Sequence, residues 1–184
     1  MDDSYRGILA RADDHFRAVR ERLGNHLECR VGCTGCCHGL FEIGSADVAM
    51  ISDALRAADP ALRATLVARS REMLETFDAP PLRDCDPSEK EAFFERAGDV
   101  PCPALDVSGA CVIYDHRPIV CRTFGLPIRE GASYLGQECE LNFVNALREE
   151  KESAAWDLEW EDATGPDDQF TIPEAIVLGS LFLD

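Results

Sequence analysis

The chain contains 184 residues, of which 46% are hydrophobic and 29% charged, a composition that excludes a mainly disordered protein and allows a sizeable core. Its 35 acidic residues outnumber its 18 basic residues, which gives a formal net charge of −17 at pH 7. A field of that sign repels phosphate backbones and anionic lipids, so it argues against nucleic acid and membrane surfaces as main partners.

Residues 4–27 carry apolar side chains three and four positions apart, a spacing that predicts an N-terminal helix. The next stretch, residues 28–44, holds four cysteines and four glycines and is too irregular to form a packed helix throughout. Ser45 is the expected cap of a helix over residues 46–58. Pro60 opens a further predicted helix, which runs to about residue 77.

The sequence Asp86-Pro87-Ser88-Glu89 joins a capping residue, a first-turn proline and an acid, and predicts the start of a short helix through Phe94. The following residues, 99–139, are again rich in cysteine and are interrupted by prolines. Within this stretch we expect a short buried strand at 111–114, a helical turn over 118–124 capped by Asp115, and a small hairpin over 128–135.

The C-terminal part begins with a predicted helix over residues 141–151 and ends with an apolar helix that starts at Ile172-Pro173-Glu174. The pattern as a whole predicts a mainly α fold in which several helices pack around an irregular cysteine-rich metal-binding core with a short β hairpin. We expect a single domain over residues 1–184. Its parts are an N-terminal helix (1–28), the metal-binding core (29–139), and C-terminal helices with an acidic segment (140–184).

The start of the chain lacks the basic residues and apolar run of a secretory signal, and its longest apolar stretch, residues 175–183, is shorter than the roughly 20 residues that span a bilayer. We therefore expect a cytoplasmic protein. In a reducing compartment, clustered cysteines more often bind metal or perform redox chemistry than form structural disulfides.

The first of two cysteine clusters has the spacing Cys29-x3-Cys33-x2-Cys36-Cys37. Two residues between cysteines is the clamp spacing of zinc and iron–sulfur sites, because one turn of chain then aims two sulfurs at a single centre. The side chains of the adjacent Cys36 and Cys37 diverge. Either one of them binds while the other packs, or the two serve different centres.

The second cluster is spread along the chain and comprises Cys102, Cys111, Cys121 and Cys139. With the first cluster it supplies eight thiols, which is enough for two four-sulfur sites, or for one four-iron cluster with thiols to spare. The alternative is that some of these cysteines are ordinary small hydrophobic residues of the core. The ninth cysteine, Cys85, lies apart in a loop rich in proline and aspartate, and we interpret it as a bystander.

The motif continues after the first cluster as Cys-Pro-x-Leu, then Cys-x-Ile-Tyr-x-x-Arg-Pro-x-x-Cys-Arg-x-Phe-Gly, then a final cysteine. This combination resembles the YkgJ-type cysteine-cluster family, which is described as a zinc- or iron-chelating domain. The resemblance implies that the metal ligands are Cys29, Cys33, Cys36, Cys37, Cys102, Cys111, Cys121 and Cys139. It also implies a link to chemistry, since related domains occur in flagellin lysine methylases associated with an iron–sulfur cluster.

Ligation by sulfur alone favours zinc, copper(I) or iron–sulfur over magnesium or calcium. On the family association, a [4Fe–4S] cluster is preferred slightly over Zn²⁺. The resulting hypothesis is a cysteine-ligated metal-binding protein whose centre supports a modification reaction. The alternatives are a zinc-stabilised protein-interaction module without catalysis and a protein for metal storage or delivery. The sequence leaves open whether the protein is an enzyme.

Several other side chains bear on the centre or on partners. Arg30 follows Cys29, and Arg117 and Arg122 flank Cys121. These arginines could compensate thiolate charge, or they could form surface ion pairs. His38 follows Cys37 and could ligate or donate to a sulfur, or lie in solvent. We interpret His116 as a supporting or surface residue, and His15 and His26 as surface positions. Trp156 and Trp160 are expected to be core or interface anchors. The acids of 149–168 are expected to form a solvated face or a docking surface for a basic protein or peptide.

Overall fold

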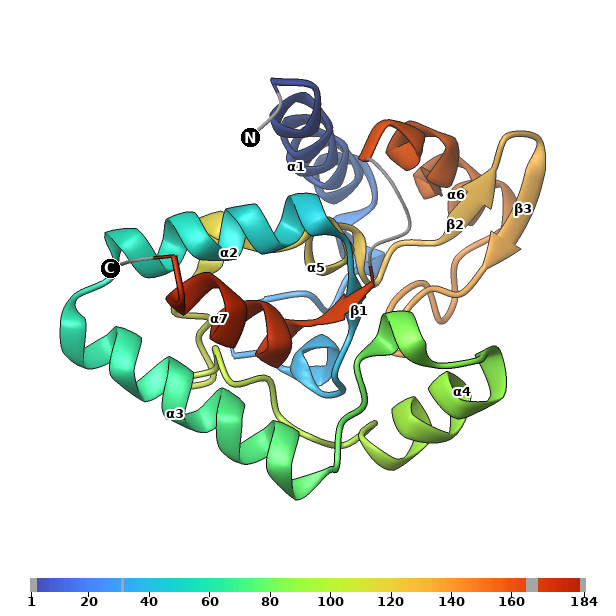
Figure 1. Ribbon diagram of the computed structural model, residues 1–184. Helices are drawn as coiled ribbons and strands as arrows, with labels where there is room; N and C mark the ends of the chain where they lie inside the picture. Colours follow the sequence, from blue (N-terminus) through green and yellow to red (C-terminus); the bar gives the residue numbers. More distant parts are fainter. Residues whose placement is uncertain (1–2, 31, 165–168, 183–184) are drawn as a thin grey trace. The chain divides into compact units, whose positions relative to one another are not determined.

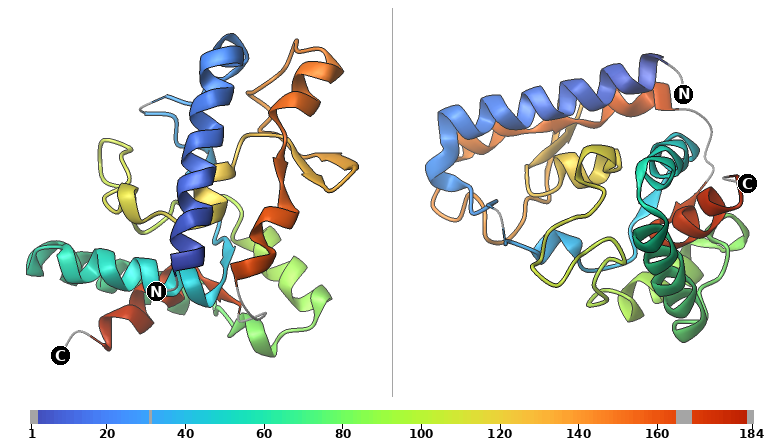
Figure 2. Two further views of the ribbon diagram at one scale, coloured as in Figure 1. Left: turned by 90° about the horizontal axis from the view of Figure 1, so that it is seen from above. Right: turned by 90° about the vertical axis from the view of Figure 1, so that its left-hand side faces the viewer.

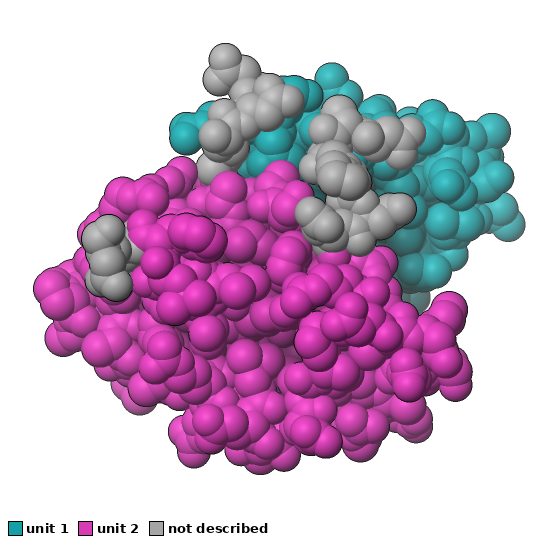
Figure 3. Space-filling view, in the orientation of Figure 1, with its two compact units in different colours: residues 1–36, 119–164 teal, residues 37–118, 165–184 magenta. Residues whose placement is uncertain are grey.

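A computed structural model describes residues 3–30, 32–164 and 169–182 of the chain (Figure 1). The predicted fold class is confirmed, because these ranges fold mainly into α-helices with short 3₁₀ turns and a few short strands. The chain forms two compact units, unit 1 (residues 1–36 and 119–164) and unit 2 (residues 37–118 and 165–184), which Figure 3 colours separately. The expectation of one domain over residues 1–184 stays a prediction.

The N-terminal helix of unit 1 is confirmed as α1 (Asp3–Leu23), although its predicted last turn is the 3₁₀ helix η1 (Gly24–His26). The apolar face of α1 contributes Val19, which is fully buried. Val19 belongs to a hydrophobic cluster whose other buried members are Leu126, Phe143 and Ala154. This cluster joins α1 to segments that follow in the sequence more than a hundred residues later.

The remaining elements of unit 1 are α5 (Ile119–Thr123), β2 (Ile128–Glu130), β3 (Ser133–Gly136), α6 (Arg148–Ala154), β4 (Trp156–Asp157) and the 3₁₀ helix η5 (Leu158–Thr164). The predicted hairpin is confirmed, since β2 and β3 pair antiparallel. Strand β4 adds in parallel to the other side of β2. Helix η5 packs against α1, and Figure 2 shows the two elements as neighbours.

The helix predicted over 141–151 begins only at Arg148, so the prediction for residues 141–147 is wrong. The chain there is held by contacts to distant segments that a helix would break. Phe143 has a left-handed φ of 55°, and its N–H donates to the carbonyl of His26 at 2.7 Å. The side chain of Asn142 makes further long-range hydrogen bonds. These tertiary bonds outweigh local helix propensity.

Unit 2 is built around three helices that the sequence predicts, α2 (Ser45–Ala57), α3 (Pro60–Thr76) and the apolar α7 (Ile172–Ser180). Helix α7 packs against both α2 and α3 (Figure 1). A two-stranded antiparallel ladder of β1 (Glu42–Ile43) and β5 (Phe170–Thr171) leads into α2 and α7 respectively. The chain therefore closes unit 2 with its C-terminal helix.

Capping residues begin most of these helices where the sequence indicates. Asp59 accepts hydrogen bonds from the first-turn amides of α3, and Thr171 accepts one from the N–H of Glu174 at 3.2 Å. The expected cap of α2 is wrong by one residue: Gly44 occupies the N-cap position and Ser45 is the first helical residue. The carboxylate of Asp47, the third helical residue, accepts from the N–H of Gly44 at 3.3 Å.

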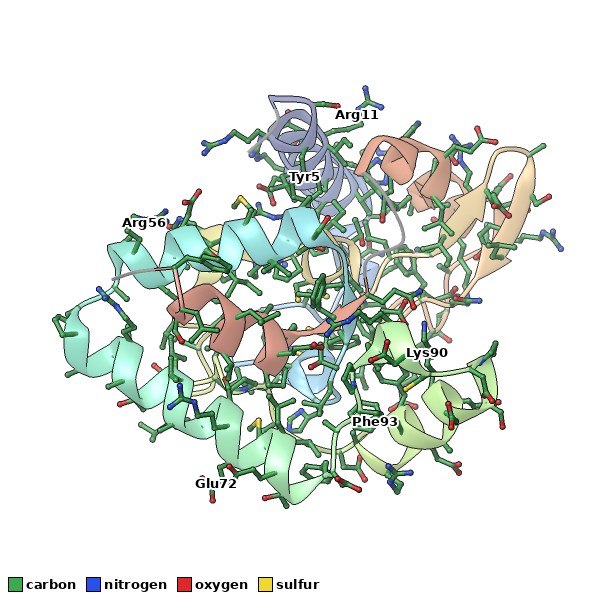
Figure 4. All side chains as sticks on the ribbon, in the orientation of Figure 1. Tyr5, Arg11, Arg56, Glu72, Lys90 and Phe93 are labelled. Carbon is green, nitrogen blue, oxygen red and sulfur yellow. The ribbon has the colours of Figure 1, made fainter. Side chains whose placement is uncertain are left out.

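A second core of unit 2 forms beneath η3 (Leu82–Asp84) and α4 (Pro87–Arg96), the short helix predicted from its start signal. Phe93 of α4, labelled in Figure 4, is 1% exposed. The other buried members of this core are Leu40, Leu82, Ala97 and Val100. The core thus ties the segment just after the first cysteine cluster to the segment just before Cys102.

The short strand predicted at 111–114 does not form. Cys111 makes a single isolated bridge to Leu105, and the chain then enters the 3₁₀ helix η4 (Tyr114–His116). The reason is a tight loop: the Asp106 carboxylate accepts from the N–H of Ser108 at 2.8 Å and of Ala110 at 2.9 Å. The pairing that follows this loop is short, because it consists of that bridge and a hydrogen bond of 2.9 Å from the N–H of Val112 to the carbonyl of Ala104 before the chain turns into η4.

None of the helices in the described ranges combines the length and the apolar character that crossing a bilayer requires.

Candidate metal centre

Four of the eight predicted ligands line one cavity inside unit 1. The cavity has a volume of about 20 Å³. Its cysteines are Cys29, Cys33, Cys36 and Cys139, three from the first cluster and one from the second. The structure therefore brings together thiols that lie far apart in the sequence.

The first three cysteines enter the cavity from a compact loop after η1. The guanidinium of Arg20 on α1 donates to the carbonyl of Cys29 and so fixes the start of this loop. Gly32 has a φ of +89°, and a hydrogen bond of 2.9 Å from the N–H of Cys33 to the carbonyl of Arg30 closes the turn. Cys36 lies in the 3₁₀ helix η2 (Gly35–Cys37). The two tight turns bring the three side chains to one wall.

Cys139 reaches the same cavity from the segment that follows β3. The backbone bends at Gln137, whose φ of 65° is left-handed. A further turn follows, in which the N–H of Asn142 donates to the carbonyl of Cys139 at 2.8 Å. Leu141 and Asn142 both line the cavity next to Cys139. This turn therefore supplies one thiol, one apolar side chain and one amide to the site.

Gly125, at the end of the Cys-Arg-x-Phe-Gly motif, forms a third part of the wall. Its φ is +93°, a backbone conformation that L side chains rarely adopt. A Cβ atom there would lie 2.9 Å from Nδ2 of Asn142 and 3.5 Å from Sγ of Cys29. The cavity therefore requires glycine at this position, both for conformation and for space.

The side chain of Asn142 connects these parts. Its Nδ2 donates to Sγ of Cys29 at 3.2 Å and to the carbonyl of Gly125 at 2.8 Å. Its Oδ1 accepts from the N–H of Glu28 at 2.9 Å. With 3% of its surface exposed, Asn142 is buried, and so is its bond to Gly125, whereas its bonds to Cys29 and Glu28 are partly buried.

The surroundings of Cys29 favour its neutral thiol form. Burial raises the pKa of Cys29, and the neighbouring Cys36, Cys33 and Cys139 raise it further when they are charged. The hydrogen bond from Asn142 acts in the opposite direction. Thiolates that line one cavity repel one another, and a bound cation would offset that repulsion, since the thiolate is the metal-binding form.

The donors and the size of the cavity fit a single soft cation. Sulfur ligands select zinc or iron over magnesium and calcium, and a volume of about 20 Å³ accommodates about one water-sized sphere. Among the residues that the structure describes, no three His, Cys, Asp or Glu side chains are already grouped as a metal site. The thiols share a cavity, and closing around an ion would require side-chain movement.

Three other predicted ligands, Cys37, Cys102 and Cys111, belong to unit 2. The N–H of Cys102 donates to the carbonyl of Cys37 at 2.7 Å, and His38 pairs with Pro101 in an isolated bridge. The N–H of Leu105 in turn donates to the carbonyl of Cys102 at 3.0 Å, and Leu105 bridges to Cys111. A continuous set of backbone hydrogen bonds thus links the segments that carry these three cysteines.

The remaining cysteines are Cys121, on α5 of unit 1, and Cys85, in the loop before α4. Cys121 does not line the cavity, although Phe124 and Gly125 just beyond it do. The sulfur of Cys85 lies 3.5 Å from the carbonyl of Pro81. None of the nine cysteines, all of which lie in the described ranges, is joined in a disulfide.

The arginines near the cysteines have partners of their own. Arg30 pairs with Glu28, and the buried Arg122 pairs with Asp13 of α1. Arg117 lies over the ring of Tyr114, with 3.7 Å from its guanidinium carbon to the ring centre. These contacts show what each guanidinium engages, and a role for any of them in compensating thiolate charge stays a prediction.

Two histidines predicted at the surface are partly buried instead. The Nε2 of His15 lies 3.0 Å from the carbonyl of Ala154, and its ring packs edge-on against Trp156 and Trp160. His26 stacks on Phe143 with 6.3 Å between ring centres. Both rings fill gaps between elements of unit 1, which periodicity along one helix does not reveal. Trp156 is fully buried, as expected of a core anchor.

Sequence reasoning missed the contribution of Asn142 and gave no role to Gly125. Asn142 lies three residues after Cys139, within a segment whose apolar spacing resembles a helix. Gly125 closes a motif that was singled out for its cysteine and arginine. Both residues could have been found from their spacing, because Asn142 lies three residues after Cys139 and Gly125 lies four residues after Cys121.

Comparison with known proteins gives one match. Residues 28–140 match the protein family CxxCxxCC, whose members are described as proposed zinc- or iron-chelating domains. The first gap in this chain, between Cys29 and Cys33, has three residues where the family name gives two. No match was found among curated proteins or among solved structures.

Proposed function

We propose, from the premise that this chain belongs to the CxxCxxCC family of zinc- or iron-chelating domains, that Cys29, Cys33, Cys36 and Cys139 hold one zinc or iron ion in unit 1. The single observation that carries this proposal is the shared cavity of these four thiols. Four thiolates complete a tetrahedral shell, which is the arrangement of closed structural metal sites.

The proposed role of this ion is to hold the loop of residues 29–36 against the turn of residues 139–142. Each segment contains a turn, closed by the hydrogen bond from the N–H of Cys33 to the carbonyl of Arg30 in one and from the N–H of Asn142 to the carbonyl of Cys139 in the other. Their described residues form no α-helix or β-strand. Metal binding at such a site contributes directly to folding, because the unfolded chain has no preformed ligand set.

We propose a single ion rather than the [4Fe–4S] cluster that the family association favours. The cavity holds about one water-sized sphere. A four-iron cube with its bridging sulfides would require a larger movement of the walls around Gly125 and Asn142 than a single ion does. Four protein thiolates leave a single ion no open coordination position, so this proposal also argues against a modification reaction at the centre.

The other expectations from the sequence stay predictions. Metal ligation by Cys37, Cys102, Cys111 and Cys121 rests on the sequence motif, and the backbone hydrogen bonds among the first three support it within unit 2. A cytoplasmic location and a basic protein or peptide partner for the acidic segment likewise rest on composition alone.

The test is metal analysis after anaerobic purification, combined with serine substitutions. Relative to wild type, Cys29→Ser and Cys139→Ser should each lose one ion per chain, whereas Cys85→Ser should retain the wild-type content. A brown protein with about four iron and four sulfide per chain, lost together in Cys29→Ser, would contradict the single-ion proposal. Retention of full metal content by both Cys29→Ser and Cys139→Ser would exclude the site altogether.

The unit 2 cysteines provide an independent comparison. If Cys36 and Cys37 serve different centres, Cys37→Ser should keep the ion that Cys29→Ser loses. The double variant Cys29→Ser/Cys37→Ser should then lose more metal than either single variant. If Cys29→Ser, Cys37→Ser and the double variant all lose the same amount of metal, one centre uses both Cys29 and Cys37.

A further inference from the structure

Asn142 is a buried amide whose oxygen and nitrogen both form hydrogen bonds at the cavity. Its oxygen accepts from Glu28, and its two amide hydrogens serve the sulfur of Cys29 and the carbonyl of Gly125. These partners come from two separate segments of unit 1, Glu28–Cys29 and Gly125, and Asn142 itself lies in a third. One side chain therefore ties together the parts of the chain that form the wall of the site.

The orientation of this amide follows from its partners. The backbone N–H of Glu28 is only a donor, so Oδ1 of Asn142 must face it at 2.9 Å. The carbonyl of Gly125 is only an acceptor, so Nδ2 must face it at 2.8 Å. Rotating the amide by 180° would break both bonds. The second hydrogen on Nδ2 is thereby left for Sγ of Cys29, 3.2 Å away.

We infer that Asn142 is a positioning residue that donates a hydrogen bond to the metal-bound thiolate of Cys29, an inference that rests on the proposed metal site. Four thiolates around a divalent cation leave a net charge of −2 in a partly buried cavity of a chain that is already strongly acidic. A buried N–H donor offsets part of that charge and fixes the direction of the sulfur lone pairs.

The surroundings support a neutral donor in this role. Arg30, the arginine next to Cys29, is exposed and pairs with Glu28, whereas Asn142 is buried and points its Nδ2 at the sulfur. The absence of a Cβ at Gly125 makes this approach possible, because a methyl group there would lie 2.9 Å from Nδ2. Glycine at 125 and asparagine at 142 thus form one arrangement around Cys29.

The test uses Asn142→Asp and Asn142→Ala, with Val19→Ala as the matched control. Aspartate has nearly the shape of asparagine and keeps an acceptor for Glu28, but it removes both donors and places a carboxylate beside the thiolate. Alanine removes the donors without adding charge. Val19 lies in the same hydrophobic cluster as Phe143, the neighbour of Asn142, so its truncation lowers stability without touching a sulfur.

Two quantities are measured on each purified protein. The first is Zn²⁺ affinity by competition with a chromophoric chelator, which we expect to fall about 10- to 100-fold in both Asn142 variants and less than threefold in Val19→Ala. The second is the sulfur-to-metal charge-transfer band of the Co²⁺-loaded form. This band should move to lower energy in both Asn142 variants, because a thiolate without its hydrogen bond gives up an electron more easily.

The outcomes separate this inference from the proposed function. A wild-type protein that shows no thiolate charge-transfer band with Co²⁺ overturns the metal site itself. If wild type shows the band, the role of Asn142 is overturned, with the site left intact, when both Asn142 variants have the band at the wild-type energy and bind Zn²⁺ as tightly as Val19→Ala does. Because the band is read from the loaded form alone, a partly unfolded variant still gives a decisive result.

Discussion

Gly125 illustrates how much of the site depends on one residue. Its backbone is in the left-handed region, and the place where a side chain would begin is already occupied by the amide of Asn142. Strain at such a position costs about 1–3 kcal/mol before any steric conflict is counted. The glycine at the end of the Phe-Gly motif is therefore required by the geometry around Cys29.

We predict that Gly125→Ala lowers the free energy of unfolding by about 2 kcal/mol or more and weakens Zn²⁺ binding. Gly35→Ala is the matched control, since Gly35 also lies among the ligands but a Cβ there has nothing within 4 Å. Urea titration and chelator competition measure the two effects. Equal behaviour of the two variants would show that the space at residue 125 is not limiting.

His15 is a second residue whose environment has a measurable consequence. Burial lowers the pKa of its ring below the ordinary value of about 6.5. The hydrogen bond to Ala154 raises this pKa in part, and the charges of Arg22 and Arg129 lower it. The folded protein consequently takes up this proton at a lower pH than the unfolded chain does. The neutral form of His15 stabilises the fold above about pH 6.5, and that contribution is lost as pH falls below it.

We expect the free energy of unfolding of wild type to decrease between pH 7 and pH 5 more steeply than that of His15→Gln. Glutamine does not titrate in this range and can still donate to the carbonyl of Ala154. Urea denaturation at both pH values, followed by tryptophan fluorescence, measures the difference. Identical slopes for the two proteins would refute the lowered pKa.

Among the elements, helix α4 has the clearest local cause. The Asp86 carboxylate accepts from the N–H of Ser88 at 2.8 Å and of Glu89 at 2.9 Å, while Glu89 accepts in return from the N–H of Asp86 at 2.9 Å. This reciprocal box, together with Pro87 in the first turn, fixes where the helix begins. The position of Phe93 in the core of unit 2 follows from that start.

Asp86→Ala should therefore lower the free energy of unfolding by about 1 kcal/mol, the usual contribution of a capping side chain. Glu72→Ala provides the comparison, since Glu72 is an exposed residue of α3 (Figure 4) whose removal should change stability by less than about 0.5 kcal/mol. Urea unfolding followed by far-ultraviolet circular dichroism gives both values. A loss in Asp86→Ala no larger than that in Glu72→Ala would contradict the capping role.

The segment of residues 141–147 shows the opposite case, an element that local pattern predicts wrongly. Its apolar spacing is that of a helix, but Asn142 and Phe143 form long-range hydrogen bonds to Glu28, Gly125 and His26. A helix would direct those backbone and side-chain groups elsewhere and leave buried polar atoms unsatisfied, at a cost of about 1–3 kcal/mol each. The irregular turn is the lower-energy choice once unit 1 has formed.

On the scale of the whole molecule, the two compact units divide the cysteines. The boundary passes between Cys36, which lines the cavity of unit 1, and Cys37, which belongs to unit 2. Both tryptophans of the chain, Trp156 and Trp160, lie in unit 1. Their fluorescence therefore reports on the unit that contains the proposed metal site.

Removing the metal with a strong chelator should lower the tryptophan-detected melting temperature by about 10 °C, as expected if binding contributes about 4 kcal/mol. Hydrogen exchange should meanwhile change little in α2, α3 and α7 of unit 2. Cys29→Ser serves as the control, since its melting temperature should not respond to the chelator. A shift of equal size in Cys29→Ser, or none in wild type, would contradict a stabilising ion in unit 1.

The sequence by itself determined the family, the mainly α class, the hairpin, the starts of α3, α4 and α7, and the set of candidate thiols, because these depend on spacing and capping within a few residues. Only the tertiary structure decided which thiols share a cavity, that Cys36 and not Cys37 is among them, and that Asn142 and Gly125 shape the site. Those features depend on which distant segments meet when unit 1 closes. The hydrogen-bond partners of a buried amide such as Asn142 come from distant segments that meet only in the folded unit, so the residues next to it in the sequence do not reveal them.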